Sequence, residues 1–269
     1  MTAAHATYLR FENVGLVYPD GTAALSEVTF DVPGGQFCVV LGPSGSGKST
    51  LLRTVNGLSA PTDGRVTIGG TPVDRASVRR LRPAIGMIHQ HFGLVARASV
   101  AHNVIAGAVA TLPFWRALMG VYPRALTDKA CRLLAAVGLQ PEHLVRRVGA
   151  LSGGQQQRVG IARALMQDPT LILADEPAAS LDPGVARDIL RLIRREAATR
   201  GVTVLCTLHQ VELAREFADR IVALQLGRVA FDGPPARFDR AAVERIYGSG
   251  ATAASDLEPA YPALRMSGS

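Results

Sequence analysis

Apolar residues alternate with polar ones at the start of the chain and later occur in short uninterrupted runs. The alternation over residues 8–14 and 25–32, with the turn-rich segment PDGTAA between them, predicts two antiparallel strands. Runs that are apolar throughout are typical of strands buried on both faces of a sheet. They occur at residues 37–41, 85–89, 171–174 and 202–207. Shorter strands are predicted at 64–70, 220–224 and 228–231.

Helical periodicity separates these strands. Residues 95–150 show it without a convincing strand, which predicts an α-helical subdomain inserted into an α/β core. Within the insertion, Thr127 is the expected N-cap of a helix that ends at Gly138. Its apolar positions, at i, i+3, i+4 and i+7, are Ala130, Leu133, Leu134 and Val137. Further helices are expected up to residue 56, over 155–166, from residue 183 and over 234–247.

Composition narrows the class of protein. The 269 residues are 48% hydrophobic, enough for a buried core, and residues 249–269 are predicted to form a disordered tail behind a domain at 1–248. The 29 basic and 22 acidic residues give a charge of +7, but the arginines are scattered, so nucleic acid is not expected as a partner. Three cysteines without metal-binding spacing fit a reducing compartment.

Neither the N-terminus nor the apolar windows predict membrane insertion. The N-terminal residues show no signal peptide, and the apolar window 100–121 is interrupted by polar residues and proline. The protein is therefore expected on the cytoplasmic side, with any membrane association coming through a partner.

A glycine-rich loop follows the run at 37–41 and fits the template GxxxxGK[ST]. Glycines let backbone N–H groups turn toward a phosphate, and the next helix presents its N-terminus to the same anion. Lys48 is expected to reach the β- and γ-phosphates of a nucleotide, and Ser49 to ligate Mg²⁺. The motif alone leaves many nucleotide-binding families open. The expected binding residues are Gly42, Pro43, Ser44, Gly45, Ser46, Gly47, Lys48, Ser49 and Thr50.

Two carboxylates end the apolar run LILADE. In an α/β protein this places Asp175 and Glu176 at the carboxyl edge of the sheet, where ligands bind. Asp175 is expected to hold Mg²⁺, and Glu176 to orient and deprotonate the water that attacks the γ-phosphate. The alternative is a solvated acidic pair at the end of a strand.

The segment LSGGQ, residues 151–155, is a second helix start free of bulky side chains, and so a second candidate anion site. In the order GPSGSGKS, LSGGQ, LILADE, the chain resembles the ATP-binding cassette family. The resemblance implies a P-loop NTPase core (RecA-like) with an N-terminal antiparallel β subdomain and an inserted α-helical subdomain. It also implies a homodimer enclosing two ATP, in which each subunit completes the other's site with Ser152, Gly153, Gly154 and Gln155.

The resemblance covers about residues 1–248 and implies roles for four more positions. Tyr18 matches the aromatic residue that stacks on adenine, and Gln90 the glutamine loop between Mg²⁺ and the permease. Asp182 matches the dimer-crossing loop, and His209 the switch histidine at the γ-phosphate. A surface tyrosine and a capping histidine are the plainer alternatives. The implied catalytic set is Glu176, His209 and Gln90, and the implied metal set is Ser49, Gln90 and Asp175.

Segments such as LPFWRALMGVYPRAL, ADEPAASLDP and GRVAFDGPP are similar to the ATP-binding subunit of bacterial phosphonate importers. The chain departs from that pattern at His89, where phenylalanine is usual, and at Gly93, where asparagine is usual. In this segment Trp115, the only tryptophan, is expected with Phe114 to pack inside the helical lobe, the alternative being contact with the permease.

The sequence thus predicts an ATPase subunit that energises phosphonate import. Its expected partners are a second copy, an integral membrane permease and an extracytoplasmic substrate-binding protein, with the chain peripheral on the cytoplasmic side of the inner membrane. Phosphate, phosphite or amino acids are alternative cargoes. A soluble cassette ATPase of DNA repair or translation is the alternative outside transport.

Overall fold

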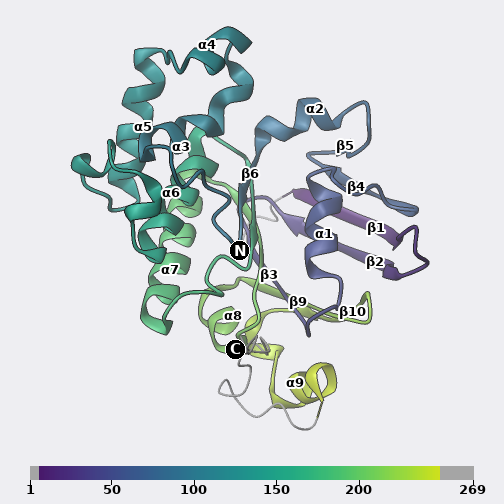
Figure 1. Ribbon diagram of the computed structural model, residues 1–269. Coiled ribbons are helices and arrows are strands. Elements are labelled where there is room, and N and C mark those ends of the chain that lie inside the picture. Colours follow the sequence, from purple (N-terminus) through teal and green to yellow (C-terminus); the bar gives the residue numbers. More distant parts are fainter. Residues whose placement is uncertain (1–5, 249–269) are drawn as a thin grey trace, which may run out of the picture.

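The computed structural model describes residues 6–248, apart from the side chains of Phe114, Ala117 and Leu118. An antiparallel sheet lies on one side of a mostly parallel sheet, and a helical lobe lies on the other (Figure 1). The fold is therefore the predicted α/β arrangement. The tail predicted at 249–269 lies outside the described residues, and the division of the chain at residue 248 stays a prediction.

The antiparallel sheet forms from the N-terminal part of the chain, in the order β2-β1-β4-β5. Its strands are β1 (Thr7–Val17), β2 (Ala23–Pro33), β4 (Asp63–Ile68) and β5 (Thr71–Pro72). Leu9 and Phe11 lie two residues apart on β1 and are fully buried, as the period of two requires. The predicted hairpin is confirmed, and β1 extends past residue 14 because it pairs with β4 as well as β2.

The six-stranded sheet has the order β10-β9-β3-β8-β7-β6 and is parallel except for β10. Its strands are β3 (Phe37–Leu41), β6 (Ile85–Ile88), β7 (Leu171–Asp175), β8 (Thr203–Thr207), β9 (Arg220–Gln225) and β10 (Arg228–Gly233). Along β3, Phe37 and Val39 pack into the core on the helical side, whereas Cys38 and Val40 pack into the core under the antiparallel sheet. Burial on both faces explains why this strand reads as an unbroken apolar run.

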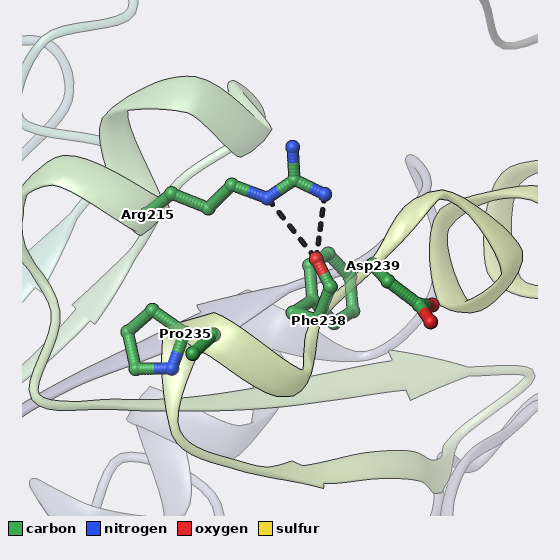
Figure 2. Close-up of a pocket in the computed structure, with 5 residues that line it drawn as sticks. Arg215, Pro235, Phe238 and Asp239 are labelled. Atoms are coloured by element: carbon green, nitrogen blue, oxygen red, sulfur yellow. Dashed lines mark hydrogen bonds between the residues drawn. The ribbon is translucent and has the colours of Figure 1, made fainter.

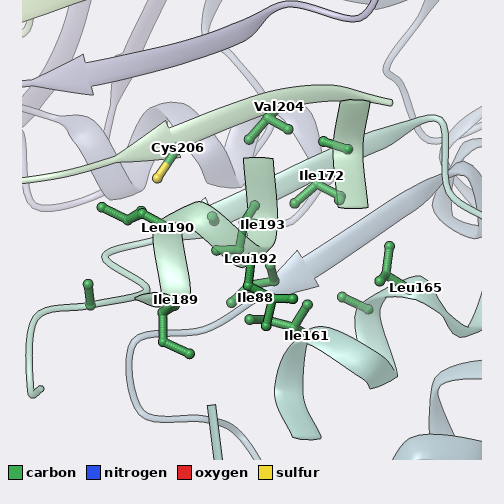
Figure 3. Close-up of a cluster of buried hydrophobic side chains, with 14 of the residues drawn as sticks. Ile88, Ile161, Leu165, Ile172, Ile189, Leu190, Leu192, Ile193, Val204 and Cys206 are labelled. Carbon is green, nitrogen blue, oxygen red and sulfur yellow. The ribbon is translucent and has the colours of Figure 1, made fainter. Parts of the chain in front are cut away.

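Helices cover the six-stranded sheet. Those outside the lobe are α1 (Lys48–Val55), α2 (Val78–Leu81), α7 (Pro183–Arg200), α8 (Val211–Phe217) and α9 (Arg240–Tyr247). The helix predicted from residue 183 is confirmed as α7, and its Ile189 and Ile193 are buried in the same core as Ile172 and Val204 of the sheet (Figure 3). The apolar stripe on α7 therefore fixes which face it turns to the sheet.

The helical lobe contains α3 (Val100–Ile105), α4 (Phe114–Met119), α5 (Arg124–Ala136) and α6 (Gly153–Ala164). The ends of the predicted insertion meet at its base. Ser99 and Arg147 form an isolated antiparallel bridge, and the Gly149 N–H donates to the Ala96 carbonyl at 2.9 Å. Residues 95–150 thus leave the core and return to it at one place.

Two helices of the lobe begin earlier than the sequence predicts. Thr127 is not an N-cap, because α5 begins at Arg124, and the Pro123 carbonyl accepts the Thr127 N–H within the first turn. Pro123 is the N-cap instead, with an extended backbone (φ −58°, ψ 140°), so the helix begins directly after the proline and Thr127 lies within it. The helix expected from residue 155 begins at Gly153 because Ser152 caps it.

The packing predicted for Trp115 is wrong. Its residue is 55% exposed, and the Arg116 guanidinium lies over the indole ring, 5.1 Å from its centroid. Met119, at the end of the same helix, is 71% exposed. The described part of α4 therefore presents apolar side chains to solvent instead of filling the lobe. Within residues 6–248, no helix has both the length and the apolar character needed to span a membrane.

Candidate active site

The site lies at the carboxyl edge of the six-stranded sheet, where β3, β7 and β8 end side by side. Each of these strands is followed by polar residues singled out in the sequence. The glycine-rich loop follows β3, Glu176 follows β7, and His209 lies two residues beyond β8. Because parallel strands end at the same edge, residues far apart in sequence meet here.

The glycine-rich loop between β3 and α1 has a backbone that only glycine can adopt at two positions. Gly42 has φ +148°, and a Cβ there would lie 2.3 Å from the Leu224 carbonyl oxygen. Gly47, the N-cap of α1, has φ +101°, and a Cβ there would lie 2.6 Å from the Ala24 carbonyl oxygen. The loop is therefore pressed against β2 and β9, and these glycines cannot be replaced without moving it.

The first turn of α1 is open to an anion. Its N-cap, Gly47, has no side chain to occupy the first amides, and no acidic residue lies in the first turn. The Ser46 hydroxyl oxygen is buried and has no hydrogen-bond partner in the described residues. An uncapped helix start beside an orphaned hydroxyl fits the phosphates of a nucleotide.

Lys48 is held inside the loop that precedes it. The residue is only 5% exposed, and its Nζ donates to the carbonyls of Gly42 at 2.8 Å and Pro43 at 3.0 Å. Burial lowers the pKa of Lys48, and the negative charges of Glu176 and Asp175 offset part of that shift. The ammonium is thus held by the glycine-rich loop and feels the charges of the two carboxylates.

Asp175 accepts hydrogen bonds from two hydroxyls. Ser49 Oγ donates to Asp175 Oδ1 at 3.2 Å, and Thr207 Oγ1 donates to the same oxygen at 2.9 Å. Thr207 also accepts the Glu176 N–H at 2.9 Å, so it fixes both acidic residues. The sequence reasoning missed Thr207. Its only signal is its place at the end of a buried strand, two residues before His209.

Glu176 combines an unusual backbone with a charged partner. Its φ is +47°, a conformation that non-glycine residues rarely adopt, and one that clusters at functional sites. Its Oε1 lies 2.5 Å from His209 Nε2. Burial raises the pKa of Glu176, but the hydrogen bond and charge of His209, together with the charges of Lys48 and His91, bring it below its usual value of 4.5. The carboxylate is therefore ionised at neutral pH.

Gln90 lies at the same edge but outside this cluster. It follows β6, the neighbour of β7, by two residues, and its side chain makes no hydrogen bond to any residue in the range 6–248. The loop behind it passes through the left-handed region, with φ of +54° at Phe92, which is unfavourable for phenylalanine, and +57° at Gly93, which glycine adopts readily. A left-handed φ explains why glycine can stand at position 93, where asparagine, which also tolerates this region, is usual.

Two side chains of the lobe hold this loop, and the sequence reasoning missed both. The Arg163 guanidinium, on α6, donates to the carbonyls of Phe92 and Gly93. Asn103, on α3, accepts the Val95 N–H at 2.8 Å and donates to the Val95 carbonyl at 3.1 Å. The lobe is therefore bonded directly to the segment that carries Gln90.

Tyr18 lies beside α1. Its hydroxyl is 3.0 Å from Thr50 Oγ1, so the residue expected to stack on adenine lies at the first turn of α1, directly after the glycine-rich loop.

The LSGGQ segment lies at the start of α6, apart from the glycine-rich loop at the start of α1 (Figure 1). Ser152 Oγ accepts the Gln155 N–H at 3.3 Å, and the Ser152 N–H donates to Gln155 Oε1 at 3.0 Å, so the first turn of α6 is capped by its own residues. A Cβ at Gly154 would lie 2.8 Å from Val185 Cγ1, which places this helix start against the segment that begins α7. Asp182, the N-cap of α7, makes no side-chain capping bond there. The ribbons of α1 and α6 lie well apart (Figure 1).

The structure thus brings together Lys48, Ser49, Asp175, Glu176 and His209, places Tyr18 next to them, and leaves the LSGGQ residues apart. With Asp175 bonded to Ser49 and Glu176 beside His209, the arrangement can hold a triphosphate and accept a proton from a water next to it.

Comparisons with known proteins show which proteins the chain is similar to. A family model described as ABC transporter matches residues 25–179. The chain is 54% identical over 236 residues to "Phosphonates import ATP-binding protein PhnC" of Hyphomonas neptunium, covering 88% of this chain and 90% of that protein. It is 49% identical over 239 residues to the protein of the same name from Hydrogenovibrio crunogenus, covering 89% and 88%.

Solved structures show the same likeness. The cbiO1 protein of Clostridium perfringens, described as part of the ABC transporter complex cbiONQ, has a TM-score of 0.76 and 28% identity, covering 91% of this chain and 92% of that one. The ATP-binding cassette MJ0796, a dimer in a post-hydrolysis state bound to ADP and Pi, has a TM-score of 0.72 and 32% identity, covering 84% and 98%.

Proposed function

The chain belongs to the ATP-binding cassette family, and we propose that it is the ATP-hydrolysing subunit of an importer that carries phosphonates through a separate membrane permease. One observation carries the catalytic part of this proposal. Glu176, ionised and 2.5 Å from His209, stands at the sheet edge that also carries Lys48 and the Ser49–Asp175 pair. A base, a histidine and a phosphate loop at one edge fit ATP hydrolysis.

The loop at residues 42–50 is the proposed binding site for ATP. Its uncapped helix start offers N–H groups to the phosphates, and the Lys48 ammonium can exchange its carbonyl partners for phosphate oxygens. Tyr18, held beside Thr50, is the proposed stacking partner of the adenine.

The residues that would hold Mg²⁺ are Ser49, Asp175 and Gln90. The hydroxyl of Ser49 and the carboxylate of Asp175 lie 3.2 Å apart and offer the oxygen ligands that Mg²⁺ prefers. When bound, Mg²⁺ supplies positive charge to the β- and γ-phosphate oxygens. Glu176 would accept a proton from the attacking water, and His209 would hold Glu176 and contact the γ-phosphate.

A second copy of the chain completes the proposed site. Ser152, Gly153, Gly154 and Gln155 would meet the γ-phosphate bound to the partner copy, with Asp182 in the loop that crosses the dimer. Support comes from the separation of α1 and α6 within one chain and from Asp182, whose side chain makes no capping hydrogen bond at the start of α7. A similar cassette is described as a dimer.

Transport requires partners in the membrane. We propose a membrane permease, a substrate-binding protein that acts on its outer side, and a peripheral position for this chain on the cytoplasmic side. The exposed apolar side chains of Trp115 and Met119 support a protein partner on the lobe. Phosphonate is the proposed cargo because the most similar relatives reported above are named for it, with phosphate, phosphite or an amino acid as alternatives.

The cargo is tested by deleting the gene. The deletion strain should fail to grow with a phosphonate as the sole phosphorus source and should grow normally on phosphate, with growth restored by the intact gene. Complementation with Glu176→Gln should fail. Normal growth of the deletion strain, in a host without a second phosphonate system, would reject phosphonate as the cargo, and a defect on phosphate instead would favour that alternative.

A further inference from the structure

Helix α9, the last helix of the described residues, packs against β9 of the six-stranded sheet. Its Ala242 and Ile246 are buried in the main core, and Phe238, just before the helix, is 1% exposed. Burial of three apolar side chains within nine residues fixes both the position and the rotation of the helix. The helix lies beyond residue 179, where the family match ends.

Polar contacts fix the start of α9. The Arg215 side chain, on α8, donates from Nε at 3.0 Å and from Nη2 at 2.5 Å to the Phe238 carbonyl (Figure 2). The Phe238 ring packs edge-on against Phe231 of β10, with centroids 4.8 Å apart. Asp239 then caps the helix by accepting the Ala242 N–H at 2.9 Å.

The end of α9 is fixed at the phosphate loop. Gln225, the last residue of β9, donates from Nε2 to the carbonyls of Arg245 at 3.2 Å and Ile246 at 3.3 Å. The next residue, Tyr247, accepts the N–H of Gly42 on its hydroxyl oxygen at 3.0 Å. Burial raises the pKa of Tyr247 to about 12, and the bond from Gly42 lowers it only in part, so the phenol stays neutral at physiological pH.

Gly42 is therefore held on both sides. Its N–H is bonded to Tyr247, and its carbonyl accepts the Lys48 ammonium at 2.8 Å. Gly42 is also the loop residue with φ +148° pressed against the Leu224 carbonyl. A binding loop that must keep an uncommon backbone conformation gains affinity when other groups fix that conformation before the ligand arrives.

We propose that Tyr247 is a positioning residue of the nucleotide site: its hydroxyl holds Gly42, and with it the phosphate loop, in the binding conformation. Helix α9 then sets nucleotide affinity without touching the nucleotide. This inference rests on the proposed ATP binding by the loop at 42–50. A purely structural Tyr247, which only packs α9 on the core, is the alternative.

Tyr247→Phe tests the inference because it keeps the ring and removes the acceptor. Loss of one neutral hydrogen bond corresponds to a change of about three- to tenfold. We expect the variant to bind a fluorescent ADP analogue, without Mg²⁺, about three- to tenfold more weakly, with the KM for ATP raised similarly and kcat nearly unchanged. Hydrogen exchange of the segment 40–48 should become faster, and the Tm should change little.

Tyr122→Phe is the matched control. The Tyr122 hydroxyl lies 2.9 Å from His102 Nδ1 in the helical lobe, so its removal is the same chemical change at another site. It should leave ADP affinity and exchange of the segment 40–48 as in the wild type.

Two results would overturn the inference alone. In one, the wild type binds ADP and Tyr247→Phe binds it equally well, with unchanged exchange. In the other, Tyr247→Phe lowers the Tm but leaves ADP affinity unchanged, which is the result of a purely structural role. A wild type that binds no nucleotide would overturn the proposed function and this inference together.

Discussion

The helices α1 and α6 both begin at a glycine-rich motif, yet their first turns are used differently. At α1 the N-cap is Gly47, which leaves the first amides without a side-chain partner, and Lys48 and Asp175 stand beside them. At α6 the N-cap is Ser152, whose bonds with Gln155 occupy the first turn. The difference teaches that a helix start becomes a site through the groups that surround it, and only α1 has them within one chain.

Among the variants that test this comparison, a substitution at the start of α1 should have the largest effect on ATP binding and hydrolysis. Lys48→Ala removes a buried ammonium among the groups expected to bind phosphate, and hydrogen bonds to charged groups contribute about 1.5–3 kcal/mol each. ATP affinity should fall about 100-fold and turnover with it, as measured by nucleotide titration and phosphate release.

Lys129→Ala is the control, because Lys129 is the only other lysine in the chain and its ion pair with Asp168 is at the surface. It should keep wild-type binding. Normal ATP binding by Lys48→Ala would remove the basis for placing ATP in this loop.

Glu176→Gln should separate binding from chemistry at the α1 site. An amide cannot take a proton from water, so kcat should fall about 100- to 1,000-fold while ATP binding is kept. Hydrolysis would normally reopen the proposed dimer. With hydrolysis slowed, the closed dimer should accumulate when ATP is added, and light scattering measures this increase in mass. Glu212→Gln, an exposed change in the first turn of α8, should hydrolyse ATP normally. Rapid turnover by Glu176→Gln would show that another group is the base.

Ser152→Ala tests the proposed role of the start of α6 in the dimer, and Ser99→Ala is its matched control. Each serine caps a lobe helix, Ser152 by accepting the Gln155 N–H and Ser99 by accepting the His102 N–H at 3.2 Å. Loss of either cap costs about 1 kcal/mol and should lower the Tm by about 2–4 °C. Only Ser152→Ala should also weaken ATP-driven dimerisation and turnover, with ATP binding by the monomer unchanged. Equal activity losses in both variants would mean that Ser152 acts only as a cap.

The smallest expected effect concerns pH, again on the α1 side. The pKa of Glu176 in the folded chain lies below 4.5, so its ionised form stabilises the fold at pH values above 4.5. That contribution is lost as the pH falls from 4.5 through the lowered pKa. The difference in Tm between wild type and Glu176→Gln, measured by thermal melts at pH values from 5 to 3.5, should therefore shrink as the pH falls below 4.5. A difference that stays constant down to pH 3.5 would contradict this assignment.

Local signals predicted most of the secondary structure. The buried strands β3, β7 and β8 and the helix α7 follow from runs and stripes of neighbouring residues, because burial imposes a period on the sequence. The predicted helix starts were less accurate, since a proline and a threonine can both mark a helix start within a few residues, as Pro123 and Thr127 do. The prediction that Trp115 is buried was wrong, because a single aromatic residue shows no helical or strand periodicity. Whether it is buried depends on how the other helices of the lobe pack around it.

The sequence by itself determined the chemistry available to this protein. The phosphate loop, the LSGGQ segment and the acidic strand end occur in that order, which shows which groups are available and predicts two candidate anion-binding helix starts. These motifs can be recognised in the sequence because the residues of each motif lie within a few positions of one another.

Only the tertiary structure decided which groups meet. Ser49 is hydrogen-bonded to Asp175, 126 residues away in the sequence, and Tyr247 to Gly42, 205 residues away. Strand order and helix packing bring each pair into contact. Thr207, Arg163 and Tyr247 carry no motif, because a hydroxyl or a guanidinium acquires its role from the position of its partner, which the linear pattern does not encode.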